Sequence, residues 1–160
     1  MIVEYDPKYD EQIKDLLVEL QNYLIDIDDW HTQIMSPQYR EKAYEMDMKK
    51  VKEQNGKVFV SVENGIVNGV IMGIVNENDE IDKLTNDCAK GNILELIVKN
   101  EDRGKGTGKK LLNKIEEYFK QINCARINIE VFGPNKRGLE FYGKNDYIVR
   151  DMIVSKRLRE

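Results

Sequence analysis

The chain has 160 residues, 25 basic and 29 acidic side chains, a net charge of −4 and a hydrophobic content of 41%. This length and composition predict one globular domain over residues 1–160 and exclude a disordered chain. The acidic balance argues against a general nucleic-acid-binding protein, which would present a basic domain. The chemistry of the protein therefore has to be sought in local patterns.

Neither a membrane anchor nor a metal site is visible in the sequence. No apolar run approaches the roughly 18 residues that a membrane-spanning helix needs, and the N-terminus lacks the basic and apolar regions of a secretory signal. Cys88 and Cys124 have neither a CxxC partner nor a nearby histidine, so they do not form a zinc-binding pattern. We expect a cytoplasmic protein with reduced thiols, without a metal and without membrane association.

Apolar spacing and turn residues predict the elements of the first part of the chain. Asp6-Pro7 is typical of a helix start, and Asn64-Gly65 favours a tight hairpin turn. The predicted elements are a strand at 2–5, a helix at 8–25, a helix between Ser36-Pro37 and Asn55-Gly56, and a hairpin with its return strand at 66–75.

The second part of the chain alternates between strands and helices. The predicted elements are a loop at 76–90, a strand at 93–98, a glycine-rich loop at 103–108 leading into a helix, a strand at 127–131, a short helix at 135–144 and a strand at 147–156. The run at 93–98 is almost continuously apolar, as in a central strand covered on both faces. Because a helix connects it to the strand at 127–131, these two strands should be parallel. We expect an α/β fold (α+β by some schemes) with helices on both faces of a mixed sheet.

The glycine-rich loop, Arg103-Gly-Lys-Gly-Thr-Gly108, is the most informative motif. Its glycines let the backbone turn tightly and approach a ligand without a side-chain clash. Free N–H groups at the start of the following helix favour an anion, and Arg103, Lys105, Lys109 and Lys110 add positive charge. A phosphate or pyrophosphate is therefore the expected ligand.

Two nucleotide-binding patterns do not fit this loop. An ATP-binding P-loop needs a glycine five residues before its Gly-Lys pair and a Ser or Thr after it, but these positions hold Arg103 and Lys110. The dinucleotide pattern G-x-G-x-x-G fails because Lys109 stands where its third glycine belongs. The alternative without a ligand is a glycine-rich turn with ordinary surface lysines.

The loop resembles the phosphate loop of the GNAT superfamily of N-acetyltransferases, R/Q-x-x-G-x-G/A. Arg103, Gly106 and Gly108 fit its fixed positions. The segment VFGPNKRGLEFYGKNDY at 131–147 resembles the ending of the same family, with matches at Val131, Asn135, Phe141, Tyr142 and Lys144. The resemblance covers most of the chain from about 57 to 155. It implies the GNAT fold, a mixed and mostly antiparallel sheet with a central parallel strand pair.

The resemblance also implies acetyl-CoA as the co-substrate. Its pyrophosphate is expected on the glycine-rich loop, and its pantetheine arm along the strand at 93–98, where main-chain N–H groups would polarise the thioester carbonyl. Asn135 is expected to contact the pantetheine amides, although an Asn after Pro134 is also an ordinary helix cap. The expected cofactor-binding residues are Ile97, Val98, Arg103, Gly104, Lys105, Gly106, Thr107, Gly108, Lys109 and Asn135.

Glu95 and Tyr142 are the expected catalytic residues. Glu95 is the one charged residue inside ILELIV, where burial would raise its pKa and suit it to act as a general base, directly or through a water. The alternative is a glutamate that helps to hold the strand. Tyr142 lies at the position of the family's catalytic tyrosine and would protonate the leaving CoA thiolate; the alternative is a core tyrosine.

Three aspartates, Asp26, Asp28 and Asp29, precede Trp30 between the first two predicted helices, in a region that often walls the acceptor site in this family. The expected acceptor residues are Asp26, Asp29 and Trp30. Acidic groups beside an aromatic ring suit a cationic amine, although most acidic runs are simply solvated. We predict an N-acetyltransferase in which a primary amine, preferably a small cationic one, attacks acetyl-CoA directly. The alternatives are acetylation of protein N-termini or lysines, and a non-catalytic CoA-binding regulatory module. The oligomeric state is left open, with dimers frequent in the family.

Overall fold

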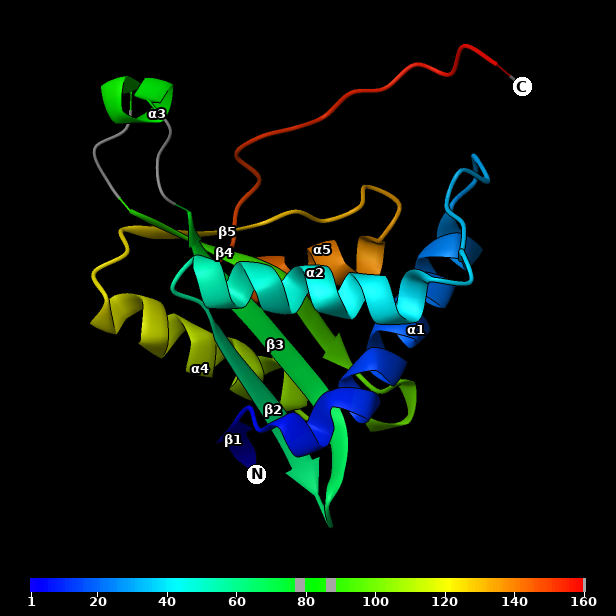
Figure 1. Cartoon of the computed structure of the whole chain (residues 1–160). Coiled ribbons are helices and arrows are strands. Elements are labelled where there is room, and N and C mark those ends of the chain that lie inside the picture. The colour runs from blue at the N-terminus through cyan, green and yellow to red at the C-terminus, as the bar shows by residue number, and fades with distance from the viewer. Residues whose placement is uncertain (77–79, 86–88, 160) are drawn as a thin grey trace. The chain divides into compact units, whose positions relative to one another are not determined.

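The computed structural model describes residues 1–76, 80–85 and 89–159 (Figure 1). They form two compact units, Met1–Glu130 and Val131–Glu160. The first unit contains, in chain order, β1 (Ile2–Glu4), the short turn η1 (Pro7–Tyr9), α1 (Asp10–Ile27), α2 (Tyr39–Glu53), β2 (Lys57–Glu63), β3 (Ile66–Asn76), α3 (Glu80–Thr85), β4 (Lys90–Val98), the turn η2 (Asn100–Asp102), α4 (Thr107–Gln121) and β5 (Arg126–Ile129). The second unit contains α5 (Lys136–Lys144).

The first unit is a mixed sheet with the strand order β1-β2-β3-β4-β5. The pairs from β1 to β4 are antiparallel, and β4 and β5 are parallel. The helix α4 connects the two parallel strands, which confirms the predicted crossover. The expected fold class, a mostly antiparallel mixed sheet with one parallel pair, is therefore confirmed.

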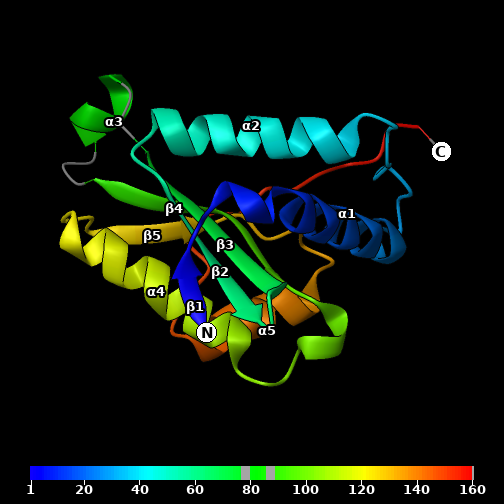
Figure 2. The same ribbon diagram turned by 60° about the horizontal axis from the view of Figure 1, so that its bottom comes forward.

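Helices cover both faces of the sheet, as Figure 2 shows for α1, α2 and α4. On one face, Leu16 and Leu17 of α1 and Tyr44 of α2 join the main core cluster with Val60 and Val70 of the sheet. On the other face α4 packs closely: a side chain on Gly91 of β4 would lie 2.6 Å from the ring of Phe119. A β4 side chain therefore points either toward α1 and α2 or toward α4, depending on the face of the sheet on which it lies.

Local sequence signals begin and end the elements as expected. The Asp6 side chain accepts a hydrogen bond of 3.0 Å from the Lys8 N–H at the start of the first helical turn. Asn64 and Gly65 have φ angles of 52° and 78°, the left-handed pair that a two-residue hairpin turn requires. The predicted helices and hairpin of the first part are confirmed.

Two predicted segments differ from the structure. The stretch at 76–90 was expected as a loop, with at most a frayed turn, but Glu80–Thr85 form the helix α3; Asn76 ends β3 and Lys90 begins β4. Residues 77–79 and 86–88, including Cys88, lie outside the described residues.

The predicted strand at 147–156 is wrong, because residues 147–159 have no regular secondary structure. Alternating apolar residues indicate which side chains gain from burial, but a strand also needs a neighbouring backbone to pair with. Among the described residues, this segment has no such strand partner.

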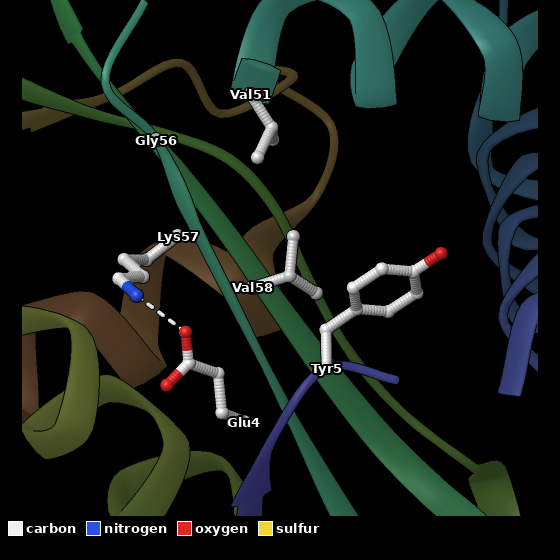
Figure 3. A pocket seen from close by; sticks show the side chains of 6 residues that line it. All are labelled: Glu4, Tyr5, Val51, Gly56, Lys57 and Val58. Carbon is white, nitrogen blue, oxygen red and sulfur yellow. Dashed lines mark hydrogen bonds and ion pairs between the residues drawn. The ribbon is translucent and has the colours of Figure 1, made fainter. Parts of the chain in front are cut away.

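A hollow of about 160 Å³ lies between β1, the start of β2 and the end of α2 (Figure 3). It is lined by Glu4, Tyr5, Val51, Gly56, Lys57 and Val58. An ion pair between Glu4 and Lys57 closes one side of it. None of the predicted site residues lines this hollow, so it is separate from the expected site.

Candidate active site

The glycine-rich loop of the first unit forms an open backbone cradle at the start of α4. Gly104 and Gly106 have φ angles of 76° and 83°, which side-chain-bearing residues rarely adopt. A Cβ atom at either position would meet no other atom within 4 Å, so this surface is open to a ligand. The Lys110 N–H donates to the Gly106 carbonyl at 3.1 Å, and the N–H groups before it belong to the unpaired first turn of the helix. The residues therefore fit a phosphate group held by main-chain N–H donors.

The basic side chains of this loop divide into two groups. Lys109 and Lys110 are exposed beside the helix start and add positive charge there. Lys105 forms an ion pair of 2.8 Å with Asp102. Arg103, in contrast, has its guanidinium engaged with the preceding turn. Its binding of a phosphate stays a prediction, and its contacts give it a second, structural role.

Arg103 and Glu19 connect the loop to α1. The Arg103 Nε donates to the Val98 carbonyl at 3.0 Å, and its Nη1 donates to the Asn100 side chain at 2.8 Å. The Asn100 N–H in turn donates to the Glu19 carboxylate at 2.8 Å, and Arg103 lies 3.7 Å from the same carboxylate oxygen. Arg103 also lies 6.0 Å from the centre of the Tyr23 ring. These contacts fix the chain between the end of β4 and the first glycine of the loop.

We expect Glu19→Ala to raise the KM for acetyl-CoA about tenfold. A hydrogen bond to a charged group contributes roughly 1.5–3 kcal/mol, and the bond between Asn100 and Glu19 should lie at the low end of this range because it is partly exposed. Glu19→Gln keeps an acceptor for the Asn100 N–H and should cause a smaller rise. Steady-state kinetics at saturating amine would measure this, with Glu117→Gln on the outer face of α4 as the control. An unchanged KM in Glu19→Ala would contradict the positioning role.

The edge of β4 next to the loop has no strand partner over part of its length. Its parallel pairing with β5 covers only Lys90 to Ile93, so the β5-side edge from Leu94 to Val98 is unpaired among the described residues. The register with β3 also shifts here, since Met72 pairs with Glu95 and Gly73 with Ile93, which leaves Leu94 as an extra residue. Main-chain groups near Ile97 and Val98 can therefore pair with a ligand instead of a strand.

Glu95 lies on the face of β4 that α1 and α2 cover. Ile97, two residues further along the strand, belongs to the core cluster on that face. Burial, and then the nearby charge of Asp47, raise the pKa of Glu95 to about 8, while Lys50 acts in the opposite direction. Among the described residues, the Glu95 carboxylate has no hydrogen-bond partner, so its predicted alternative as a hydrogen-bonded strand anchor gains no support.

Sequence reasoning missed Asp47, which lies on α2 close enough to Glu95 to affect its ionisation. Burial raises the pKa of Asp47 as well. Tyr39, on the same helix, has its pKa raised to about 12 by burial and then by the charges of Glu95 and Asp47. The signal was present in the sequence, because Tyr39, Ala43 and Asp47 follow one another at the four-residue spacing of one helix face.

The acidic segment after α1 is organised by Asp28, the one aspartate of the predicted acceptor region that was not among the expected acceptor residues. Asp28 is 4% exposed and accepts hydrogen bonds from Trp30, Thr32 and Gln33. Burial alone would raise the pKa of Asp28, but these bonds outweigh it and lower the pKa to about 2. The predicted acceptor residues Asp26, Asp29 and Trp30 are exposed around this ordered turn.

The second unit holds the two remaining predicted residues, Asn135 and Tyr142. The Asn135 side chain accepts a hydrogen bond of 2.9 Å from the Gly138 N–H and so caps α5. Tyr142 is buried, with the rings of Phe141 and Tyr147 centred 5.2 and 5.5 Å from its own. These two ring contacts restrain the orientation of the Tyr142 ring within this unit.

Comparison with known proteins agrees with this geometry. The model of the Acetyltransferase (GNAT) family matches residues 24–147. The chain belongs to the GNAT acetyltransferase family. Members of this family use acetyl-CoA as co-substrate, and the chain is accordingly an acetyl-CoA-dependent acyltransferase. The open cradle of the glycine-rich loop fits the phosphates of that co-substrate.

Individual relatives support the same assignment. An acetyltransferase of Yersinia pestis (strain Pestoides F) is 30% identical over 115 residues, which cover 71% of this chain and 74% of that protein. An uncharacterised N-acetyltransferase of Methanocaldococcus jannaschii is 38% identical over 68 residues, which cover 42% of this chain and only 44% of that protein. Both similarities agree with the GNAT family model.

Solved structures show the same GNAT fold. A mutant protein from Bacillus halodurans has a TM-score of 0.80 at 17% identity, with 99% of each chain covered. The glucosamine-6-phosphate N-acetyltransferase from Arabidopsis thaliana has a TM-score of 0.64 at 17% identity, with 99% of this chain and 98% of that chain covered. In the described part of this acetyltransferase, no helix is long and apolar enough to cross a membrane. The same residues contain no group of three or more His, Cys, Asp or Glu side chains placed to hold a metal ion.

Proposed function

We propose that this acetyltransferase transfers an acetyl group from acetyl-CoA to a small cationic primary amine, with Glu95 as the general base. The observation that carries the proposal is the Glu95 carboxylate, which lies in the central strand β4 without a hydrogen-bond partner among the described residues. A carboxylate that only held the strand together would be expected to have such a partner.

The donor side of the proposal rests on the loop and on the edge of β4. The N–H groups from Gly104 to Lys109 bind the pyrophosphate, with Lys109 adding charge. The unpaired edge near Ile97 and Val98 holds the pantetheine arm and polarises the thioester carbonyl. When bound, acetyl-CoA supplies the activated acetyl group. Asn135 is proposed to contact the arm in addition to capping α5.

The acceptor side of the proposal rests on negative charge at the end of α1. Asp26 and Asp29 are exposed there, beside the exposed ring of Trp30. The C-terminal end of a helix carries partial negative charge, so it adds to the attraction of these carboxylates for a cation. This arrangement favours a small amine with more than one positive charge over a neutral amine.

Glu95 and Tyr142 are proposed to move the two protons of the reaction. An alkylammonium has a pKa near 10.4 and is not nucleophilic until it loses a proton. Glu95, with its pKa raised to about 8, accepts that proton more readily than an ordinary carboxylate would. Tyr142 then donates its phenolic proton to the departing thiolate.

The acceptor can be tested by measuring CoA release from acetyl-CoA with a panel of amines. The panel contains polyamines, aminoglycosides, amino acid derivatives, neutral amines, and peptides with a free lysine or N-terminus. We expect release to be fastest with small amines that carry two or more positive charges. Asp26→Asn with Asp29→Asn should raise the KM for the best amine and leave the KM for acetyl-CoA unchanged, whereas Glu117→Gln changes neither. Faster reaction of the peptides would favour a protein acceptor, and silence across the panel would favour a CoA-binding module.

A further inference from the structure

Four polar side chains share one face of the sheet at the start of the parallel strands β4 and β5. A side chain on Gly91 would collide with α4, and alternate residues of a strand point to opposite faces. Lys90 and Asn92, on either side of Gly91, therefore lie on the face that α1 and α2 cover. In the parallel register Lys90 is opposite Arg126 and Asn92 is opposite Asn128, which puts all four side chains on this face.

Two buried atoms of this group have no hydrogen-bond partner in the part of the chain that the structure describes. They are the Nε of Arg126, which is a donor, and the Oδ1 of Asn92, which is an acceptor. Arg126 has no ion pair with a described residue either. Native proteins pair almost all of their buried polar atoms with protein groups, water or a bound molecule. A donor and an acceptor left without protein partners on neighbouring strands therefore point to a bound molecule that contacts both.

Charge indicates that this molecule is an anion. Lys90 is only 7% exposed and lies opposite Arg126, so two cationic side chains are neighbours on a largely buried face. Like charges that face each other across a strand pair repel, and burial strengthens the repulsion. An anion bound between them would replace this repulsion with attraction. A guanidinium group also donates well-directed hydrogen bonds to the oxygens of phosphates and carboxylates.

The amide groups favour phosphate among the small oxyanions. A hydrogen phosphate ion carries an O–H donor as well as acceptor oxygens, so it can satisfy the Oδ1 of Asn92 and the Nε of Arg126 together. Sulfate and acetate at neutral pH offer acceptors only. Asn128, opposite Asn92 in the register, adds a second amide with both donors and an acceptor.

We propose that the acetyltransferase binds a phosphate ion at the start of β4 and β5, between Arg126 and Lys90, with Asn92 accepting its O–H. This site is separate from the glycine-rich loop. A strand rises about 3.3 Å per residue, so Lys90 lies roughly 25 Å from Val98, the end of β4 that the loop follows. The inference does not depend on the acceptor amine or on the role of Glu95.

The test measures the Tm of the full chain with CoA at a saturating concentration, so that the glycine-rich loop is occupied. We expect inorganic phosphate at ten times its Kd to raise the Tm by roughly 3–5 °C. Sodium sulfate should raise it less, and sodium chloride at the same ionic strength should not reproduce the rise. Arg126→Gln should lose the response to phosphate, whereas Arg150→Gln, which removes an exposed arginine, should keep it.

Asn92→Asp gives a second test, because it places a carboxylate of nearly the same shape beside the two cations. This variant should raise the Tm of the phosphate-free protein and abolish the response to phosphate, even if Arg126→Gln fails to fold. In NMR spectra of the ¹⁵N-labelled protein, the Nε–H signal of Arg126 should shift saturably as phosphate is added.

Three results would overturn the proposal: a wild-type protein that does not respond to phosphate, a response that survives in Arg126→Gln, or a lower Tm in Asn92→Asp. The rise in Tm caused by acetyl-CoA should persist in all of these variants. Failure of the phosphate site is therefore distinguishable from failure of the proposed acetyl-CoA site.

Discussion

Gly106→Glu is expected to abolish both the stabilisation of the protein by acetyl-CoA and its acetyl-transfer activity. The φ angle of Gly106 is 83°, so any side chain there strains the first turn of α4. A glutamate also brings negative charge to the N–H groups that would bind the pyrophosphate. For the wild type, acetyl-CoA at 100 times its Kd adds about 2.7 kcal/mol of stability. For a chain of this size, this corresponds to a rise in Tm of roughly 5–10 °C.

Gly65→Glu is a matched control for this prediction. Gly65 has a φ angle of 78° and, like Gly106, open space around its Cβ position, but it lies in the turn between β2 and β3. Gly65→Glu should lower the Tm of the ligand-free protein about as much as Gly106→Glu does, but the rise in Tm caused by acetyl-CoA should persist. Thermal melts with and without acetyl-CoA measure both effects. A full ligand shift in Gly106→Glu would remove the glycine-rich loop from the binding site.

Glu95→Gln is expected to lower kcat by roughly 10²–10⁴-fold, because a general base contributes about that factor to the rate. The same substitution should remove the acidic limb of the pH–rate profile. Only the ionised carboxylate can accept a proton. Because the pKa of Glu95 is raised to about 8, wild-type kcat/KM should rise with pH up to about 8 and then level. Asp47→Asn removes one cause of the raised pKa and should move this limb to lower pH.

Tyr142→Phe provides the contrast for this experiment. It should also lower kcat, because the leaving thiolate loses its proton donor, but the acidic limb should persist and the acetyl-CoA shift in Tm should be unchanged. A retained acidic limb in Glu95→Gln would assign the base to another group. Unchanged turnover in Tyr142→Phe would leave Tyr142 as a packing residue between Phe141 and Tyr147.

The raised pKa of Glu95 also predicts a change in stability with pH. The folded protein holds this proton more tightly than the unfolded chain, whose glutamate pKa is near 4.5. The stability associated with Glu95 is therefore fully present below about pH 4.5 and is lost as the pH rises through about 8. In the same melts, Glu95→Gln should lack this loss and should exceed the wild type in Tm above pH 8.

Most of the fold could be predicted because its signals are local. Asp6 caps the first turn, Asn64-Gly65 makes the hairpin, and the apolar run at 93–98 forms part of the central strand β4. The failure at 147–156 has a different origin. Apolar alternation there is real, but strand formation depends on a partner backbone that no local pattern specifies.

The sequence by itself determined the order of the elements from β1 to α5 apart from α3, the parallel strand pair, the glycine-rich loop before α4 and membership of an acetyltransferase family. These depend on spacing, on turn residues and on motifs that are contiguous in the chain. Only the tertiary structure decided the surroundings of Glu95, because Asp47 acts on it from α2, a separate element that packs on the same face of the sheet. It likewise decided that Arg103 contacts Glu19, 84 positions away, and that β4 has an unpaired edge beyond Ile93. Such features arise from packing between distant segments, so their charges, burial and free hydrogen-bonding groups exist only once the chain has folded.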